Sequence, residues 1–357
     1  MLRRLFLVLG LAAVVIGGWF VWLLWMAGEF RPLAPHFAGT CVQVNGIVGA
    51  EDITIHPATG VAYISAYDRR AVDAGEPGQG ALYAYDLNRR VPQLANLTPD
   101  APEDFSPHGI SLHVSQSGPD LLFAVNHAGG KHSIEIYELA PRALVHRKTI
   151  RDDLLISPND IVAVDNQRFY VTNDHGSAPG FMRTLEEYLR LPRAGVVYYD
   201  GKTFRQVVSG LRYANGINAS RDGGRVYVNS LLDMTLNVYD RDPATGALRP
   251  REEVPLGSGG DNIEVDAEGN LWIGAHPHLL TLARHRQDPG LPAPSQVIRV
   301  SPGPSGALAV TEIFLDLGER LSAASVAARR GNRLLIGPVW DRRFLDCTQA
   351  PGAAGDG

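Results

Sequence analysis

Polar residues that β-strands usually avoid stand directly before short apolar runs at several places in this sequence. One example is the pair Asn159-Asp160, which precedes the apolar run 161–164 in "SPNDIVAV". Because Asn and Asp are depleted in strands and favour turns, the pair could simply form a turn that leads into a strand. Alternatively, its carboxylate and amide oxygens could bind a ligand, if other oxygens of the same kind lie nearby.

The same arrangement recurs along the chain. Six segments carry a small or polar pair, then Ile or Val, then a short strand-like run: "EDITI" from Glu51, "HGISL" from His108, "NDIVAV" from Asn159, "NGINA" from Asn215, "DNIEV" from Asp261 and "ASVAA" from Ala324. Successive segments begin 57, 51, 56, 46 and 63 residues apart, counting from Glu51 to Ala324. A four-stranded propeller blade needs about 40–50 residues, and somewhat more with long loops, so each interval can hold one blade. The sequence therefore predicts an all-β fold, a six-bladed β-propeller in which the six runs are the innermost strands.

A propeller would bring the polar pairs together, because its innermost strands all begin at one end of a central tunnel. Ca²⁺ takes 6–8 oxygen ligands from carboxylates, amides, backbone carbonyls and water. Glu51 and Asp261 would supply two negative charges, and Asn159, Asn215 and Asn262 would add neutral oxygens. Without a cation, carboxylates crowded in a narrow tunnel would repel one another and be poorly solvated. An all-oxygen set without Cys or His disfavours zinc.

The remainder of the chain supports this fold class and excludes several functions. Runs such as "VAYISAY", "RVYVNSL" and "RLLIGPV" alternate with Gly- and Asn-containing turns, as in all-β proteins. The net charge of −5 and the lack of a basic run argue against nucleic acid as a partner. The sequence contains no G-x-S-x-G motif, P-loop or Rossmann fingerprint, so a serine-hydrolase or nucleotide-binding mechanism is not expected.

The N-terminus carries a separate hydrophobic segment. Residues 5–27 are uncharged, follow Arg3 and Arg4, and are long enough to cross about 30 Å of hydrocarbon as a helix. A cleaved signal peptide is the alternative, but Trp25 stands where its cleavage site needs a small residue. We therefore expect a single-pass membrane anchor, with the arginines in the cytoplasm and the remaining domain on the periplasmic or extracellular side. The expected organisation is an anchor over 1–28, a linker over 29–38, a propeller over 39–348 and a flexible tail over 349–357.

The chain has two cysteines, Cys41 and Cys347, near opposite ends of the expected exported domain. Neither has the neighbouring Cys or His residues that a zinc site needs. Export to an oxidising compartment makes a disulfide plausible, and it would tie the first strand to the last and so close a ring. Two unrelated buried thiols are the alternative.

Several longer motifs together resemble the paraoxonase/arylesterase family. They include "EDITIHPATGVAYIS", "FSPHGISL", "SPNDIVAV", "YANGINAS", "DNIEVD" and "LLIGPVW", which run in family order between Cys41 and Cys347. Each motif alone is weak, but the combination is specific. The resemblance implies a calcium-dependent lactonase with a six-bladed propeller, related more distantly to gluconolactonases and strictosidine-synthase-like proteins. It also implies an N-terminus that often stays uncleaved and a disulfide that matches the two cysteines.

The resemblance further implies two calcium ions. The catalytic ion would be held by Glu51, Asn159, Asn215, Asp261 and Asn262. A structural ion deeper in the tunnel would be held by Asp52, Asp160 and the backbone carbonyl of Ile110. The first residue of "ED" and of "ND" would then face the upper ion and the second the lower ion, which the alternation of an extended segment allows.

A lactone carbonyl oxygen at the upper ion would be polarised, and the developing oxyanion would be stabilised there. His108 and His127 match the histidine pair to which the family assigns the activation of water, with His108 as the base and His127 orienting it. An ordinary histidine pKa of about 6.5 suits this role. Alternatively, calcium-bound water attacks while His108 only lines the pocket, or both histidines are structural.

Three further features bear on the substrate. His175 and His276 match family positions that line the site, although each could equally be a packing residue. The segment 180–191 places Phe181, Leu185 and Tyr188 on one face of a predicted helix. In the family this insertion lies over the active-site mouth and can meet lipid; packing on the blade rims is the alternative. The polar segment "DRRAVDAGEPGQG" replaces a family loop that carries an aromatic residue, so specificity does not transfer.

The leading hypothesis is a membrane-anchored, calcium-dependent hydrolase of small-molecule lactones and aryl esters, held in the lipid bilayer by residues 5–27. The same scaffold could instead act mainly on phosphotriesters or sugar lactones. A third possibility is a non-catalytic binding propeller in which calcium only adds stability. The presence of a complete upper ligand set together with both histidines argues against this third possibility, because a scaffold needs only the lower ion.

Overall fold

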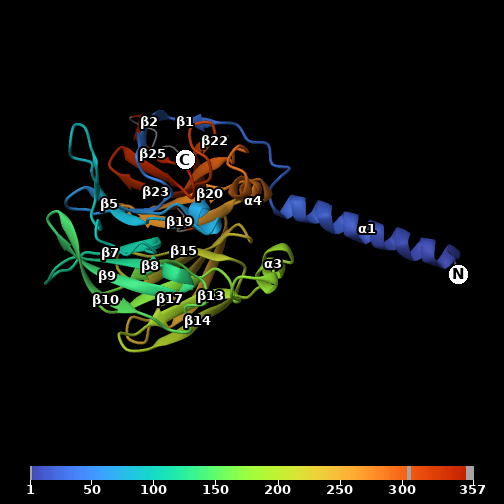
Figure 1. The fold of residues 1–357 in the computed structure, drawn as a ribbon, viewed down its shortest axis with the longest axis horizontal. Coiled ribbons are helices and arrows are strands. Elements are labelled where there is room, and N and C mark those ends of the chain that lie inside the picture. The colour runs from blue at the N-terminus through green and yellow to red at the C-terminus, as the bar shows by residue number, and fades with distance from the viewer. Residues whose placement is uncertain (1, 304–306, 351–357) are drawn as a thin grey trace.

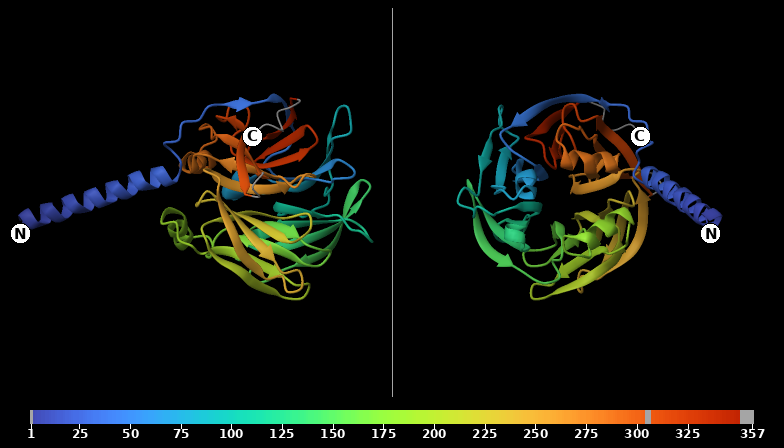
Figure 2. Two further views of the ribbon diagram at one scale, coloured as in Figure 1. Left: turned by 180° about the vertical axis from the view of Figure 1, so that it is seen from behind. Right: turned by 45° about the vertical axis from the view of Figure 1, so that its right-hand side comes forward.

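The computed structural model of the 357-residue chain describes residues 2–303 and 307–350. Its antiparallel sheets form the six blades of a ring, with one long helix projecting from it (Figure 1). Figure 2 shows the sheets arranged as a ring. The predicted all-β, six-bladed propeller is therefore confirmed. Residues 351–357 of the expected tail lie outside the described residues, and the last strand extends one residue past the expected boundary, to Gln349.

Each of the first three blades is a four-stranded meander. Blade 1 contains β3 (Ala50–Ile55), β4 (Val61–Ala66), β5 (Ala81–Asp86) and β6 (Leu94–Asn96). Blade 2 contains β7 (Pro107–His113), β8 (Leu121–Asn126), β9 (Ser133–Ala140) and β10 (Ala143–Ile150). Blade 3 contains β11 (Pro158–Ala163), β12 (Phe169–Asn173), β13 (Ala194–Tyr199) and β14 (Phe204–Leu211).

The other three blades follow the same plan, with additions from the N-terminal part of the chain. Blade 4 contains β15 (Ala214–Ala219), β16 (Arg225–Ser230), β17 (Thr235–Arg241) and β18 (Leu248–Pro255). Blade 5 contains β19 (Gly259–Val265), β20 (Leu271–His276), β21 (Ser295–Pro302) and β22 (Leu308–Asp316), extended by β1 (His36–Phe37). Blade 6 contains β23 (Ala324–Arg330), β24 (Arg333–Pro338) and β25 (Arg343–Gln349), completed by β2 (Gly39–Asn45).

The six predicted runs are the first strands of the six blades, and they surround the axis. β3, β7, β11, β15, β19 and β23 each contact the next in this order, and β23 contacts β3 to close the circle. Apolar side chains fill the space between neighbouring blades. Ile53 and Ile64 of blade 1 pack with Val326 of blade 6, for example, and all three are fully buried. Burial of a side chain of this kind contributes about 1.5–3 kcal/mol.

The ring is closed by the N-terminal strand. β2 pairs antiparallel with β25, and Cys41 stands directly opposite Cys347. The two cysteines form a disulfide across 306 residues of sequence. The predicted bridge between the first and last strands is therefore confirmed, and the alternative of unrelated thiols is wrong.

Every innermost strand contains a β-bulge near its start. In each blade the pairing with the second strand shifts by one residue there. The bulged segments include Glu51, His108, Asn159, Asn215, Asp261 and Ser325. Because a bulge sets two residues against one, it breaks the side-chain alternation and re-aims side chains. We expected the regular alternation of a strand to point the two residues of each polar pair in different directions. In the structure a bulge at the start of each innermost strand interrupts that alternation.

Glycine follows the polar residue in two of these bulges, and it permits close contact between blades. A Cβ atom on Gly109 would come within 2.3 Å of Asp160 Oδ1, and one on Gly216 within 2.2 Å of the Asp261 carbonyl oxygen. A larger residue at either position would push the next innermost strand away. The two glycines therefore set how tightly the tunnel closes.

Four α-helices and one short 3₁₀ turn accompany the blades in the described residues. They are α1 (Leu2–Met26), α2 (Arg69–Asp73), η1 (Ala128–Gly130), α3 (Phe181–Tyr188) and α4 (Leu279–Gln287). In Figures 1 and 2, α1, α3 and α4 lie on the same side of the ring. The stretch Arg3–Met26 has a mean hydropathy of 2.4 and could cross a membrane by length and composition.

α3 confirms the predicted helix, and its apolar face is exposed. Phe181 is 76% exposed and Leu189 48%, whereas Glu186 is buried. The polar side of α3 faces the protein because it finds partners there: Glu186 accepts a hydrogen bond from the Gly176 amide, and Arg183 donates to Ser157. Packing of the apolar face on the blade rims is therefore wrong.

The expected linker over residues 29–38 is docked on the blades. Glu29 accepts hydrogen bonds from the Leu280 amide in the first turn of α4, and Arg31 donates to the Gly257 carbonyl. The last turn of α1 also packs on the ring, because Leu23 and Ala27 are buried. First-turn amides of a helix lack partners within the helix, so Glu29 satisfies a group that would otherwise be unpaired.

Candidate active site

A cavity of about 750 Å³ opens at the tunnel end where the innermost strands begin. Bulge residues from five blades line it, namely Glu51, His108, Asn159, Asn215 and Asp261. Its upper wall comes from α2, α3, α4 and the end of α1. Residues distributed over 210 positions of the sequence, from 51 to 261, therefore meet in one place, as the propeller geometry predicts.

Four buried oxygen atoms at this tunnel end have no hydrogen-bond partner within the part of the chain that the structure describes. They are Glu51 Oε2, Asn159 Oδ1, Asn215 Oδ1 and Asn262 Oδ1. The amide nitrogens of two of these asparagines are engaged: Asn262 Nδ2 donates to Glu51 Oε1 at 2.9 Å, and Asn159 Nδ2 to Asp174 at 3.4 Å. Glu51 Oε2 forms an ion pair with Arg69 Nη2 but no hydrogen bond. Buried polar atoms are nearly always hydrogen-bonded in folded proteins, so such a group of oxygens indicates a missing electropositive partner.

The chemistry of this oxygen set fits a hard cation such as Ca²⁺. It combines two carboxylates, Glu51 and Asp261, with asparagine oxygens from three other positions. Among residues 2–303 and 307–350, no group of three His, Cys, Asp or Glu side chains could hold a metal ion by itself. A cation at this site would therefore depend on the asparagines.

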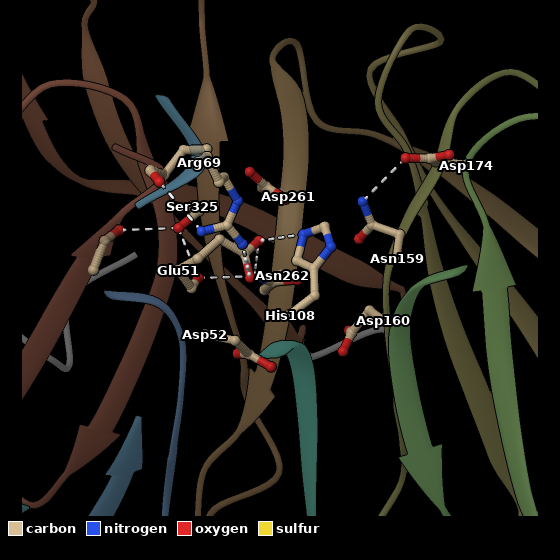
Figure 3. A network of polar contacts seen from close by, with 12 residues as sticks. Glu51, Asp52, Arg69, His108, Asn159, Asp160, Asp174, Asp261, Asn262 and Ser325 are labelled. Atoms are coloured by element: carbon tan, nitrogen blue, oxygen red, sulfur yellow. Dashed lines mark hydrogen bonds and ion pairs between the residues drawn. The ribbon is translucent and has the colours of Figure 1, made fainter. Parts of the chain in front are cut away.

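Two further carboxylates lie deeper in the tunnel, below the cavity (Figure 3). Asp52 accepts hydrogen bonds from the amides of Ile53 and Ile110, and Asp160 from those of Ile161 and Ile217. Each carboxylate thus links its own blade to the next. Burial raises the pKa of Asp52 well above its ordinary value, and the charge of Glu51 adds to this effect. Burial and the charge of Asp52 do the same to the pKa of Asp160.

Glu51 contacts three polar side chains at the tunnel end, His108, Arg69 and Asn262. His108 Nε2 lies 3.4 Å from Glu51 Oε1, and Arg69 Nη2 lies 3.4 Å from Glu51 Oε2 (Figure 3). Burial opposes ionisation of Glu51. The attraction of His108 and Arg69 and the hydrogen bonds from His108 and Asn262 outweigh it and lower the pKa to about 2. Glu51 is therefore ionised at neutral pH.

A chain of three imidazoles leads away from Glu51. His108 Nδ1 lies 2.8 Å from His127 Nε2, and His127 Nδ1 lies 2.8 Å from His132 Nδ1. Burial lowers the pKa of His127 well below its ordinary value, and the charges that His108 and His132 would carry lower it further. A neutral imidazole has one donor and one acceptor nitrogen, so His127 can accept from one neighbour and donate to the other.

His175 and His276 both line the cavity, and both bind carboxylates. His276 Nε2 lies 2.8 Å from Asp261 Oδ2 and so fixes the orientation of that carboxylate. His175 lies between Asp174, at 2.7 Å, and Glu187 of α3, at 3.0 Å. Although burial lowers the pKa of His175, these two hydrogen bonds raise it to about 9. His175 is thus a charged link between the propeller and α3.

Several residues of the cavity were not identified by sequence reasoning. Arg69 belongs to α2, in the segment that departs from the family pattern. His132 follows the η1 turn, and Asp174 and Glu187 act through His175. The only signal for Asp174 was its place beside a candidate histidine in "TNDH". Arg69 and His132 lie in connecting segments with no periodic pattern, and Glu187 lies on the predicted helix, whose pattern marked only its apolar face.

The fold is a six-bladed propeller similar to those of solved structures that include a gluconolactonase. A gluconolactonase from Xanthomonas campestris superposes with a TM-score of 0.52 at 13% identity, over 90% of this chain and 99% of that chain. A luciferin-regenerating enzyme gives a TM-score of 0.52 at 13% identity, over 88% of this chain and 96% of that chain. At these identities the similarity shows the fold alone.

The chain belongs to the arylesterase family. The family model described as Arylesterase matches residues 33–348. Serum paraoxonase/arylesterase 2 of Gallus gallus is 35% identical over 323 residues, which cover 87% of this chain and 90% of the relative. Serum paraoxonase/arylesterase 1 of Homo sapiens is 34% identical over 324 residues, with coverages of 87% and 90%. The resemblance seen in the motifs is confirmed, and the family supports a hydrolase of the esterase or lactonase type.

Replacing His175 by Gln should remove a pH-dependent part of the folding stability. Because the pKa of His175 is raised from 6.5 to about 9 in the folded protein, its contribution is complete below pH 6.5 and disappears as the pH rises through 9. A rise of this size corresponds to about 3 kcal/mol. In urea unfolding, wild type should exceed His175→Gln by about that amount near pH 6 and by much less near pH 10. An equal difference at both pH values would contradict this assignment.

Proposed function

We propose that the protein is a calcium-dependent hydrolase of lactones and aryl esters and that the cavity at the tunnel end is its active site. The observation that carries the proposal is the set of four buried oxygens without hydrogen bonds beside a chain of histidines. A propeller that used calcium only for stability would need the deeper carboxylates but no histidine chain facing a cavity. Family membership supports the same conclusion.

Two ions can be assigned to the side chains present. Glu51, Asn159, Asn215, Asp261 and Asn262 would hold the upper, catalytic Ca²⁺. Asp52, Asp160 and the backbone carbonyl of Ile110 would hold the lower, structural Ca²⁺, whose charge would offset the repulsion between the two buried carboxylates. When bound, the upper ion would act as a Lewis acid that stabilises negative charge developing on the substrate carbonyl oxygen.

His108 is the proposed general base, and His127 is the proposed positioning residue. If His108 Nδ1–H donates to His127 Nε2, the Nε2 atom of His108 is left to accept a proton from water near Glu51. His127 would then donate through Nδ1 to His132, which fixes its tautomer. The cavity walls restrict bulk water, while His276 and Asn262 hold Asp261 and Glu51 in place before substrate binds.

Removal of calcium should abolish hydrolysis of phenyl acetate and of an aliphatic lactone, and its return should restore both. Glu51→Gln should lose at least about 10–100-fold in activity or calcium affinity, because it removes an ion-binding charge. The change of melting temperature on adding Ca²⁺, measured with EDTA-treated protein, reports binding independently of activity. Glu252→Gln, an exposed position on β18, is the matched control. Full activity of Glu51→Gln, or of the chelated wild type, would refute the proposal.

His108→Gln should lower kcat by roughly 10²–10⁴-fold, because the positioned base is removed. The calcium-induced rise in melting temperature should remain, since His108 is not an assigned ligand. His113→Gln, a change on the same strand, β7, serves as the control. If His108→Gln hydrolysed lactones at the wild-type rate, the histidine would only line the cavity, and the water-activating role would be rejected while the metal site survived.

We also propose that α1 is an uncleaved, single-pass anchor, with the propeller on the periplasmic or extracellular side. In the 18-residue window that defines the candidate span, only 6% of residues are buried, so most of its apolar surface is left uncovered by the propeller. The exposed apolar face of α3, with Phe181 and Leu189, lies on the same side of the ring and would meet the bilayer. Arg3 and Arg4 would remain in the cytoplasm.

Protein purified from membranes should therefore keep its N-terminus, and it should resist extraction with alkaline carbonate. Intact-mass analysis distinguishes this outcome from cleavage by signal peptidase. A mature chain that begins near residue 28 and is released as a soluble protein would show that the segment is a signal peptide.

A further inference from the structure

Tyr213 holds a bulky aromatic side chain on a backbone conformation that such residues rarely adopt. It lies in the connection before β15, two residues ahead of Asn215, and its φ is 62°. A bulky residue in this left-handed region is strained. The Leu231 amide donates a hydrogen bond to the Tyr213 carbonyl at 3.0 Å and helps to hold the backbone there. Strained residues that their surroundings fix in this way are concentrated at functional sites.

The ring of Tyr213 is held in the cavity wall by its neighbours. It meets the His175 ring in a T-shaped arrangement, with the ring centroids 4.8 Å apart. It also packs against the apolar cluster that contains Leu231 and Leu279. Because His175 is itself fixed by two carboxylates, the ring of Tyr213 has little freedom to turn.

The hydroxyl group of Tyr213 is accessible and uncommitted. Tyr213 is half-buried and lines the cavity. Within residues 2–303 and 307–350 its hydroxyl has no hydrogen-bond partner, and its oxygen is not among the unpaired atoms that are closed off from solvent. The neighbouring carboxylates of Asp174 and Glu187 do not use it, because both bind His175. A phenol is protonated at neutral pH, so Tyr213 can donate to a molecule in the cavity.

The proposed reaction leaves one substrate atom without a partner. The ion would polarise the carbonyl oxygen, and His108 would activate water. The second oxygen of the ester group gains negative charge as its bond to the acyl carbon breaks, and a donor aimed at that charge would stabilise it. Three arginines of the cavity wall already bind protein oxygens, namely Arg183, Arg190 and Arg286. The hydroxyl of Tyr213 is therefore available where these cations are not.

Tyr213 and His108 approach the cavity from different sides. His108 belongs to β7 and Tyr213 precedes β15, and β11 lies between these two strands around the axis. A substrate whose carbonyl is held at the tunnel end can therefore receive water from the side of β7 while its second oxygen faces the side of β15. The base and the hydroxyl donor then serve different atoms of the substrate.

We propose that the Tyr213 hydroxyl donates a hydrogen bond to the leaving oxygen of the ester or lactone. This inference rests on the proposed function and adds a catalytic residue to it. Tyr213 keeps its own proton. The proton that His108 takes from water passes to the leaving oxygen, the bond from the acyl carbon to that oxygen breaks with both electrons on the oxygen, and the net change is the addition of one water molecule.

Tyr213→Phe tests this role because it removes the hydroxyl and keeps the ring. With the full-length, calcium-loaded protein, kcat/KM for δ-valerolactone, which expels an alkoxide, should fall about 10–100-fold, since a hydrogen bond to a charged oxygen is lost. The value for 4-nitrophenyl acetate, whose leaving group is stable without a donor, should fall at most about threefold. Tyr239→Phe, at a buried tyrosine on β17 of the same blade, is the matched control and should keep both values.

A series of aryl acetates supplies a measurement that a purely structural role would not change. When the logarithm of kcat/KM is plotted against the pKa of the leaving phenol, the slope should be more negative for Tyr213→Phe than for wild type. The rise in melting temperature on adding Ca²⁺ shows that the variant is folded and binds the ion. An equal loss with every substrate, or no loss at all, would mean that Tyr213 only shapes the cavity, and the inference would be rejected.

The possible results separate this inference from the proposed function. If Tyr213→Phe behaves like wild type while both hydrolyse the lactone, the hydrolase stands and the role of Tyr213 falls. If wild type hydrolyses none of the substrates, the proposed reaction fails, and calorimetry with δ-valerolactone and cyclohexanone, which lacks the ring oxygen, decides on the hydroxyl. Tighter binding of the lactone that Tyr213→Phe abolishes would support the hydrogen bond, and equal binding of the two compounds would refute it.

Discussion

The burial of several carboxylates at one end of a narrow tunnel is the constraint on which the rest of the structure depends. Glu51, Asp52, Asp160 and Asp261 are each at most 4% exposed. Each buried charge costs several kcal/mol unless it is compensated. Backbone amides of neighbouring blades compensate Asp52 and Asp160, and His276 and Arg69 compensate the upper pair in part. The bulges, the glycines beside them and the closure of the ring all hold these carboxyl groups close together.

Much of this arrangement could be predicted from the sequence, because equivalent positions of a sequence repeat lie at the same end of the tunnel in a propeller. Once "EDITI", "NDIVAV", "NGINA" and "DNIEV" are recognised as equivalent strand starts, ring geometry requires their first residues to meet. Glu51, Asn159, Asn215 and Asp261 do line one cavity. The disulfide could be anticipated for the same reason, since a ring needs its first and last strands to pair. These predictions depend on topology and need no knowledge of side-chain conformation.

The features that could not be predicted depend on local geometry or on segments without a pattern. The sequence suggested that regular strand alternation points the two residues of each polar pair in different directions. In the structure every innermost strand has a bulge at this place, which the sequence did not indicate. Arg69 and His132 enter the site from connections whose length and path no periodicity fixes. For α3 the hydrophobic pattern indicated a helix correctly, yet the buried side is polar, because Glu186 and Glu187 find partners on the propeller. Periodicity identifies a helix, but only its neighbours decide which face is covered.

Because Glu29 binds the first turn of α4 and Leu23 lines the cavity wall, the proposed anchor and the cavity mouth form a single body. The mouth would then be held at the level of the lipid headgroups rather than on a flexible tether. For a molecule that dissolves in lipid, the concentration that the enzyme meets would be set by partitioning into the bilayer, and its search would take place in two dimensions. Amphiphilic esters and lactones are the compounds that such a search would enrich.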